Sequence, residues 1–205
     1  MLIAVAAIGL TASEAKVKQT VSDYHKLSSE LKLVEALALC SKDFKSYSAK
    51  GNVFDYETIQ KIIRFTALLE NALKENSTDE DFLNVIFESY TLRQKLELTA
   101  EQKKKIAAIY STEQGKKMLA AMKQMMQLQR AELKKELTAA LQTFKITGTE
   151  VNGDQAVVIC EYISAKEKKR EISTVKLRKT APDGKWLIFE TRDKYAAEAA
   201  PGGKI

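Results

Sequence analysis

The spacing of apolar residues changes at Phe144, and this change limits the possible folds more than any other feature of the chain. Before Phe144, apolar residues recur every three or four positions, which is typical of helices. After it, they alternate with other residues and are interrupted by Asn152-Gly153 and by the sequence Ala-Pro-Asp-Gly at 181–184. Asn-Gly favours a hairpin because both residues tolerate positive φ, and Pro-Asp-Gly favours a turn. We therefore predict four antiparallel strands in meander order after Phe144.

Two of these predicted strands carry apolar residues at both alternating sets of positions. The residues are Ala156, Val157, Val158, Ile159, Tyr162 and Ile163 in the second strand, and Trp186, Leu187, Ile188 and Phe189 in the fourth. A sheet with one face in water carries polar residues at alternate positions. Both faces of this sheet are therefore expected to be covered, one by the long preceding helix and the other by further helices, a ligand or a second subunit.

The chain before the sheet is predicted to form about five helices. A first stripe of apolar residues runs from Val17 to Leu37, and Asp55 can cap a second helix. Capping-box pairs start the next two helices, and Ser111 or Thr112 starts the last one, which runs to about Phe144. The two pairs are Ser77 with Glu80 and Thr99 with Gln102. The fold class is α+β: a helical region at 16–110, then a long helix plus a four-stranded antiparallel sheet at 111–195.

The first 15 residues contain a nine-residue apolar run from Leu2 to Leu10, followed by small residues. This run is too short to span a bilayer but has the length of a signal-peptide core. No Lys or Arg precedes it, so the alternative is the first part of a buried helix. We favour an exported protein, periplasmic or associated with the cell envelope. No Cys follows the run, so a lipoprotein anchor is not expected, and residues 196–205 read as a frayed tail.

Cys40 and Cys160 are the only cysteines of the chain. In an exported protein they could form a disulfide between the helical part and the sheet. Alternatively, both could be small buried hydrophobic residues, since each lies in an apolar pattern. With one His, they fit no familiar zinc pattern, so neither a metal nor a cofactor is expected.

The chain has a formal net charge of +6. Its lysines are interleaved with glutamates along the predicted helices, without the basic and aromatic interleaving of single-strand binders. We therefore expect no nucleic-acid partner. The same charge could favour an anionic membrane surface.

Four of the five methionines lie between residues 118 and 126. Met118, Met122 and Met125 share one helix face, and thioethers are soft ligands that suit Cu(I). However, an apolar stripe with this spacing is first of all helix core, and this one continues through Met126, Leu133, Leu137, Leu141 and Phe144. Because Met adapts to irregular shapes, the cluster could also form a contact surface for a lipid or a partner helix.

The last third of the chain resembles exported bacterial domains of the cystatin-like, or nuclear-transport-factor-two-like, fold. The matching residues are Val151, Gly153, Asp154, Ala156, Val158, Leu177, Lys179, Gly184, Lys185, Trp186 and Ile188. A second segment, residues 98–122, is similar to a helical motif of uncharacterised exported proteins, with Tyr110, Gly115 and Lys117 at matching positions. The order of helices and then a sheet resembles the toluene-tolerance phospholipid carriers. These resemblances imply a fold but no particular function.

Enzymes of this fold carry out acid–base chemistry with His, Asp or Tyr in a cone-shaped pocket. The only histidine, His25, is predicted to be an exposed or half-buried surface side chain far in sequence from the sheet. Asp154 and Asp183 lie in predicted turns, where Asp is favoured for conformational reasons. We therefore expect no catalytic residues and no enzymatic activity.

The function that these observations favour is binding of an apolar small molecule or lipid between helix and sheet. The predicted pocket consists of Met118, Met122, Met125, Met126, Leu133, Val158, Tyr162 and Trp186. The alternative is a structural or protein-interaction module of the cell envelope, a homodimer or the partner of an envelope protein, without a small-molecule ligand.

Overall fold

A computed structural model describes residues 2–94, 97–164, 166–180 and 184–196, with the side chains of all these residues except 2–11, 93 and 94. The chain forms two compact units. Unit 1 consists of residues 1–56 and 134–205, and unit 2 consists of residues 57–133. The tail predicted to be frayed, 196–205, lies outside the described residues except for its first residue.

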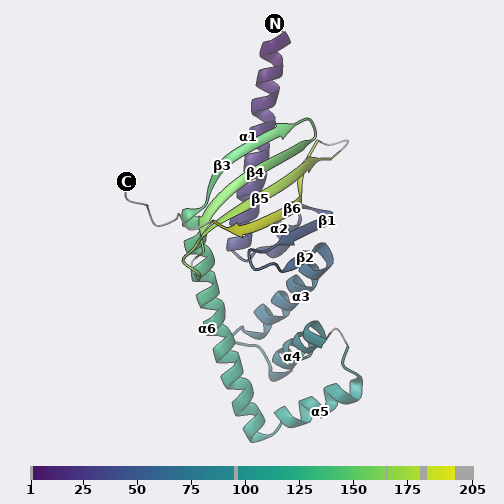
Figure 1. The fold of residues 1–205 in the computed structure, drawn as a ribbon. Coiled ribbons are helices and arrows are strands. Elements are labelled where there is room, and N and C mark those ends of the chain that lie inside the picture. Colours follow the sequence, from purple (N-terminus) through teal and green to yellow (C-terminus); the bar gives the residue numbers. More distant parts are fainter. Residues whose placement is uncertain (1, 95–96, 165, 181–183, 197–205) are drawn as a thin grey trace, which may run out of the picture. The chain divides into compact units, whose positions relative to one another are not determined.

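Unit 1 contains a six-stranded sheet with the strand order β2-β1-β6-β5-β4-β3. Its elements are α1 (Leu2–Ser29), α2 (Leu33–Leu37), β1 (Cys40–Tyr47), β2 (Val53–Asp55), β3 (Lys145–Asn152), β4 (Gln155–Ile163), β5 (Arg170–Lys179) and β6 (Trp186–Tyr195), together with the end of α6 (Glu113–Thr143). Helix α1 runs along one face of the curved sheet (Figure 1). Among the described residues, no helix is both long and apolar enough to span a membrane.

The four predicted strands are present as β3 to β6, and neighbouring strands pair antiparallel in chain order. Gly153 has φ +59° and Gly184 has φ +64°, the left-handed conformation expected of glycines in these turns. Asn152 is not among the described residues with positive φ and pairs with Gln155, so the loop of the first hairpin is Gly153-Asp154. Residues 181–183 of the second turn lie outside the described residues.

The prediction of a four-stranded sheet is wrong in one respect, because β1 and β2 extend the sheet in a region predicted to be helical. Strand β1 pairs parallel with β6, with Cys40 opposite Ile188 and Ser46 opposite Thr191. The amide of Ile188 donates to the carbonyl of Leu39 over 2.9 Å. These hydrogen bonds join residues almost 150 positions apart, so local spacing around Cys40 could not reveal them.

The two faces of the sheet are covered differently within unit 1. On the α1 side, Val158, Val175, Leu177 and Ile188 are completely buried, as is Val21 of α1. This packing confirms that a helix covers one face of the sheet. The covering helix is α1, which contacts β3, β4 and β6, whereas the prediction named the long helix before the sheet.

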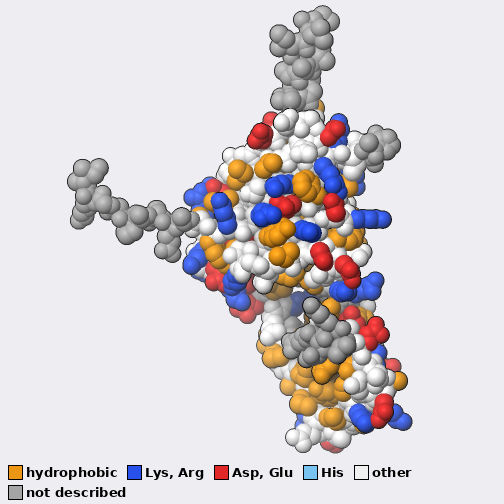
Figure 2. Space-filling view, turned by 45° about the vertical axis from the view of Figure 1, so that its right-hand side comes forward, with side chains coloured by type: hydrophobic (Ala, Val, Ile, Leu, Met, Phe, Trp, Pro, Cys, Tyr) orange, Lys and Arg blue, Asp and Glu red, His pale blue; other side chains and the backbone are white. Residues whose placement is uncertain are grey.

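The opposite face carries ion pairs in place of a second apolar layer. Oε1 of Glu190 lies 2.9 Å from Nζ of Lys176 and 2.7 Å from Nε of Arg192. The side chains of Ile159 and Ile163 on this face are 41% and 47% exposed. Figure 2 shows basic and acidic side chains interspersed over this unit. Within the described residues of unit 1, long charged side chains lie along the apolar surface of this face and keep their charges in water. Covering of this face by a ligand or a second subunit stays a prediction.

Unit 2 consists of α3 (Tyr56–Ala72), α4 (Asp79–Gln94), α5 (Ala100–Tyr110) and the first part of α6. Its core is small and is formed by Ala72, Phe82, Val85 and Leu119, against which other hydrophobic residues pack. Hydrophobic side chains also gather on the face of unit 2 that is visible in Figure 2. Its exposed large hydrophobic residues include Ile62, Leu68, Tyr90, Ile109, Met118, Met125, Leu128 and Leu133.

The predicted helix starts of unit 2 are partly confirmed. Thr99 and Gln102 form the capping box of α5, with hydrogen bonds of 2.8 and 3.2 Å. At α4 the pair is Thr78 with Asp81, one residue later than predicted, and the Thr78 hydroxyl accepts from the Asp81 amide over 3.1 Å. The Ser77 hydroxyl instead donates to the Ala72 carbonyl at the end of α3.

Candidate functional site

Unit 1 contains a cavity of about 140 Å³ between α1, the end of α6 and β4. Its lining residues are His25, Ser28, Ser29, Leu137, Ala140, Leu141, Phe144 and Tyr162. The α6 residues lie three or four positions apart, so they share one face of the helix, which is the stripe predicted from the sequence. The lining is therefore mostly apolar, with a few polar atoms contributed by α1.

His25 lies beside the sheet and not at a surface remote from it. Its ring centroid is 4.4 Å from that of Phe144 and 6.2 Å from that of Tyr162. Burial lowers the pKa of His25 to about 4, so the imidazole is neutral at pH 7. The Nε2 atom is buried and has no hydrogen-bond partner among the described residues. The side chain of His25 is half-buried, which is one of the two alternatives expected from the sequence. Its position beside Tyr162 depends on the packing of α1 on β4, which the sequence does not indicate.

The other polar groups around the cavity already have partners. The Tyr162 hydroxyl donates to Oε2 of Glu171 over 2.9 Å, and the Ser29 hydroxyl donates to the carbonyl of Lys26 over 2.7 Å. Ser28 hydrogen-bonds to the side chain of Tyr24. A buried polar atom without a partner is costly and uncommon in native proteins. His25 is one of the residues that line the cavity, and its Nε2 is a buried polar atom left without a partner among the described residues.

A half-buried acidic residue, Asp193, acts on Tyr162 of the cavity wall. Burial raises the pKa of Asp193 to about 6, the charge of Glu171 adds to this effect, and the Ser173 hydroxyl opposes it. Burial, followed by the charge of Asp193, raises the pKa of Tyr162 above its ordinary value. Tyr162 thus lines the cavity and also hydrogen-bonds to Glu171, whose charge acts on Asp193. Residue spacing does not predict that Tyr162, Glu171 and Asp193 lie together, because Glu171 is on β5 and Asp193 is on β6.

The residues of the predicted pocket are distributed over both units. Met122 and Met126 pack against the core of unit 2, whereas Met118, Met125 and Leu133 are 45%, 50% and 45% exposed. In unit 1, Val158 and Trp186 are 0% and 3% exposed and lie in the interior. Of the predicted residues in unit 1, Tyr162 lines the cavity. A pocket formed by the methionines together with sheet residues stays a prediction.

The two cysteines are free and buried, and a disulfide between them does not fit the sheet. Cys40 lies on β1 and Cys160 on β4, with β6 and β5 between these strands. Three strand spacings correspond to roughly 14 Å, whereas bonded cysteines have Cα atoms no more than about 7 Å apart. In this structure both cysteines are small buried residues, which is the other of the two alternatives left open by the sequence.

We expect both thiols to react slowly with Ellman's reagent in the folded protein and rapidly after denaturation. Burial raises the pKa of each thiol to about 12, and the reactive species is the thiolate. Protein that is purified and denatured without any reductant should show two reactive thiols per chain. A value of zero in that experiment would demonstrate a disulfide.

The described residues contain no group of three or more His, Cys, Asp or Glu side chains that could hold a metal ion. No protein-family model and no curated protein matches the chain. Similar solved structures include an NTF2-like protein with a cystatin-like fold from Novosphingobium aromaticivorans, with 10% identity, coverage of 96% of this chain and 90% of that one, and a TM-score of 0.50.

Two further NTF2-like proteins of unknown function have lower structural similarity. The one from Pseudomonas putida has 8% identity, coverage of 95% of this chain and 94% of that one, and a TM-score of 0.42. The one from Pseudomonas aeruginosa has 11% identity, coverage of 80% and 79%, and a TM-score of 0.34. The fold that the C-terminal motifs suggested is confirmed by the Novosphingobium protein, and the chain has the cystatin-like fold of NTF2-like proteins.

Proposed function

We propose that unit 1 binds a small, mainly apolar molecule in the cavity between α1, α6 and β4, with one hydrogen bond to Nε2 of His25. The observation that carries this proposal is the unpartnered, buried Nε2 atom in a cavity lined otherwise by apolar or already hydrogen-bonded groups. Ligand pockets typically combine an apolar lining with a few polar atoms that orient the ligand.

The size of the cavity limits the ligand. A volume of about 140 Å³ is close to that of dry protein cavities of about 150 Å³, which hold one benzene-sized molecule. The cavity therefore suits a single small ring or a short branched chain, or the end of a longer molecule that extends through the opening. A complete lipid chain is too large to be enclosed by it.

The protonation and hydrogen bonding of the polar groups around the cavity favour ligand binding without a catalysed reaction. The imidazole of His25 is neutral and becomes protonated only near pH 4, which makes it a weak base at pH 7. The Tyr162 hydroxyl is held by Glu171. A charged ligand would lose its hydration in this cavity without gaining a counter-ion, so the ligand is neutral. The apolar run at residues 2–10 supports placing this activity in the cell envelope.

Binding of two matched probes, benzyl alcohol and toluene, tests the proposal. Both should fit the cavity, but only the alcohol can form a hydrogen bond with His25. Because such a bond contributes about 1 kcal/mol, benzyl alcohol should bind about fivefold more tightly. In His25→Phe the two affinities should become equal. Ligand titrations followed by NMR shifts of the cavity methyl groups would measure all four affinities.

A variant that fills the cavity provides the control. Leu141→Trp should abolish binding of both probes, whereas Leu128→Trp, on the same helix but 66% exposed, should leave binding unchanged. Equal binding by the wild type and Leu141→Trp would rule out this cavity as the site. A constant preference for benzyl alcohol in His25→Phe would rule out the hydrogen bond.

A further inference from the structure

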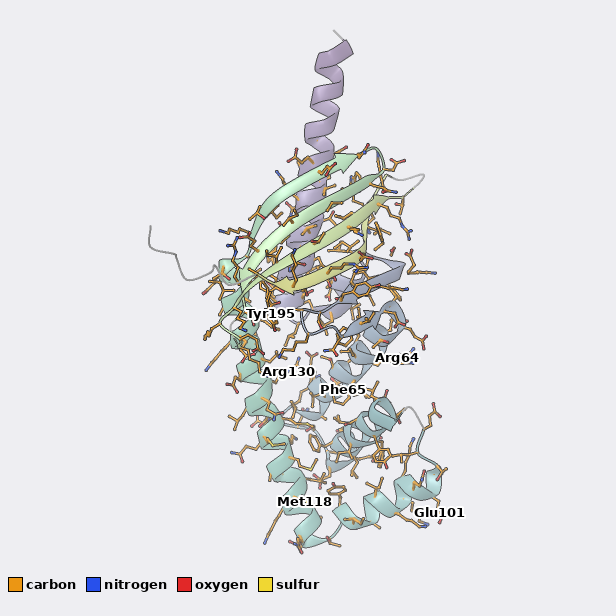
Figure 3. The ribbon with its side chains drawn as sticks, in the orientation of Figure 1. Arg64, Phe65, Glu101, Met118, Arg130 and Tyr195 are labelled. Carbon is orange, nitrogen blue, oxygen red and sulfur yellow. The ribbon has the colours of Figure 1, made fainter. Side chains whose placement is uncertain are left out.

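The charges of unit 2 are segregated along the chain. Residues 100–118 contain five lysines and two glutamates, an excess of +3, which is half of the +6 of the whole protein. Residues 57–99 contain five Lys and Arg against eight Asp and Glu, an excess of −3. We call residues 100–118 the basic turn, because they comprise α5, the connection at Ser111 and Thr112, and the start of α6. Figure 3 marks Glu101 and Met118 near the two ends of this segment.

The connection within the basic turn has a defined geometry. The amide of Gly115 donates to the Thr112 hydroxyl over 3.0 Å. Gly115 is buried, and a Cβ at this position would lie 2.3 Å from the carbonyl oxygen of Ile109. The end of α5 and the start of α6 therefore touch backbone to backbone, and the turn lies at one end of unit 2 (Figure 1). Its side chains thus project from a rigid support.

Most lysines of the basic turn are not explained by interactions within the protein. Lys105 pairs with Glu101 over 2.7 Å, and Lys103 lies above the Phe87 ring. Among the described residues, no carboxylate lies within 4 Å of Lys104, Lys116 or Lys117, which are all exposed. Positive charges near the start of a helix do not stabilise it. A cost in helix stability without compensation inside the protein suggests an external anionic partner.

An exposed apolar side chain accompanies these lysines. Ile109, near the end of α5, is 59% exposed, and Met118 is 45% exposed. On α5, residues four apart lie on one face, so Lys105 stands directly beside Ile109. Lysines around an apolar side chain are typical of segments that lie in the interface of a lipid bilayer, where the apolar side chain enters the headgroup region.

We propose that the basic turn docks on an anionic lipid surface. Lys104, Lys116 and Lys117 pair with lipid phosphates, and Ile109 inserts among the headgroups. Lys105 joins them by exchanging its exposed ion pair with Glu101, which stabilises little in water, for a phosphate. The charge excess favours this partner over a neutral surface, and the absence of aromatic residues interleaved with the lysines of 103–105 argues against nucleic acid. This site is independent of the cavity in unit 1, and either can fail without the other.

Co-sedimentation of the full chain with vesicles tests this proposal. The protein should bind vesicles of phosphatidylglycerol and phosphatidylcholine, bind pure phosphatidylcholine at least tenfold more weakly, and dissociate as salt is raised. Replacing Lys104, Lys105, Lys116 and Lys117 by Gln should weaken binding at least tenfold. Ile109→Ser should weaken it severalfold while leaving the salt dependence unchanged.

The matched control removes four charges elsewhere. Lys42, Lys45, Lys166 and Lys194 are exposed residues of unit 1, and their replacement by Gln should change binding less than twofold. Equal losses in both variants would show that only net charge matters and would overturn the proposal. Vesicle binding that persists after the four lysines of the basic turn are replaced would also overturn the proposal. It would assign the membrane contact to another segment, such as the apolar run at 2–10. If the wild-type protein does not bind vesicles but self-associates, and Ile109→Ser abolishes the self-association, the basic turn is a protein interface and the proposal is overturned.

Discussion

Gly115→Ala should destabilise unit 2 by about 3 kcal/mol, although alanine is the better helix former. In an ordinary helix the replacement stabilises by about 1 kcal/mol. Here the new Cβ would lie 2.3 Å from the carbonyl oxygen of Ile109 and 2.6 Å from the Cα of Tyr110. Both contacts are with backbone, which cannot rotate away as a side chain can. The α5–α6 turn would have to open, and the contacts of Leu119 with the small core of unit 2 would loosen.

Urea denaturation followed by circular dichroism at the helix band would measure this effect. Gln114→Ala is the matched control, because Gln114 precedes Gly115 in the same turn of α6 and is exposed. That control should be neutral or slightly stabilising. A Gly115→Ala protein as stable as Gln114→Ala would show that α5 and α6 do not approach this closely.

The second large effect is a pair of opposite pH dependences in unit 1. The pKa of Asp193 is raised from 3.8 to about 6, so the stability it contributes is complete below pH 4 and is lost as the pH rises through 6. The pKa of His25 is lowered from 6.5 to about 4. Its unfolded form takes up a proton first, so stability is lost as the pH falls from 6.5 to 4. Each shift corresponds to about 2 to 3 kcal/mol, and in the wild type the two largely offset each other.

Removing either group should therefore reveal the other. Asp193→Asn should lose about 2 to 3 kcal/mol of stability relative to wild type between pH 6.5 and 4, and His25→Phe should gain a similar amount over the same range. The fluorescence of Trp186, the only tryptophan and a buried residue of unit 1, reports unfolding in urea at each pH. The other carboxylates are present in all three proteins, so the differences between the curves isolate the two substituted groups. Parallel curves for the three proteins would contradict the assignment.

Part of the fold could be predicted because it depends on short-range signals. Asn152-Gly153 predicts a hairpin, which the positive φ of Gly153 makes possible, and Thr99 with Gln102 caps a helix through contacts three positions apart. The change of spacing at Phe144 likewise marks the end of α6 and the start of β3. Each of these features is complete within a few residues, so the sequence contains all the information needed.

The candidate site could be predicted only in part. The sequence predicts the apolar stripe of α6, but the predicted pocket contains the methionines of this stripe. The residues of the stripe that line the cavity are Leu137, Leu141 and Phe144. A stripe shows which residues share a face and not which part of that face borders an empty volume. The exposed fractions of Met118 and Met125 show how much the stripe varies along its length.

By itself, the sequence determined the four strands of the meander, the long helix before them and the fold class, because turn chemistry and helical spacing act locally. Only the tertiary structure decided that β1 joins the sheet beside β6, that Cys40 and Cys160 lie three strands apart, and that His25 stands beside Tyr162. These relations depend on which surfaces bury one another, and the partners are more than 100 residues apart in the chain. Burial then sets the pKa values of His25 and Asp193, so the chemistry of the site, unlike its scaffold, is a property of the folded chain.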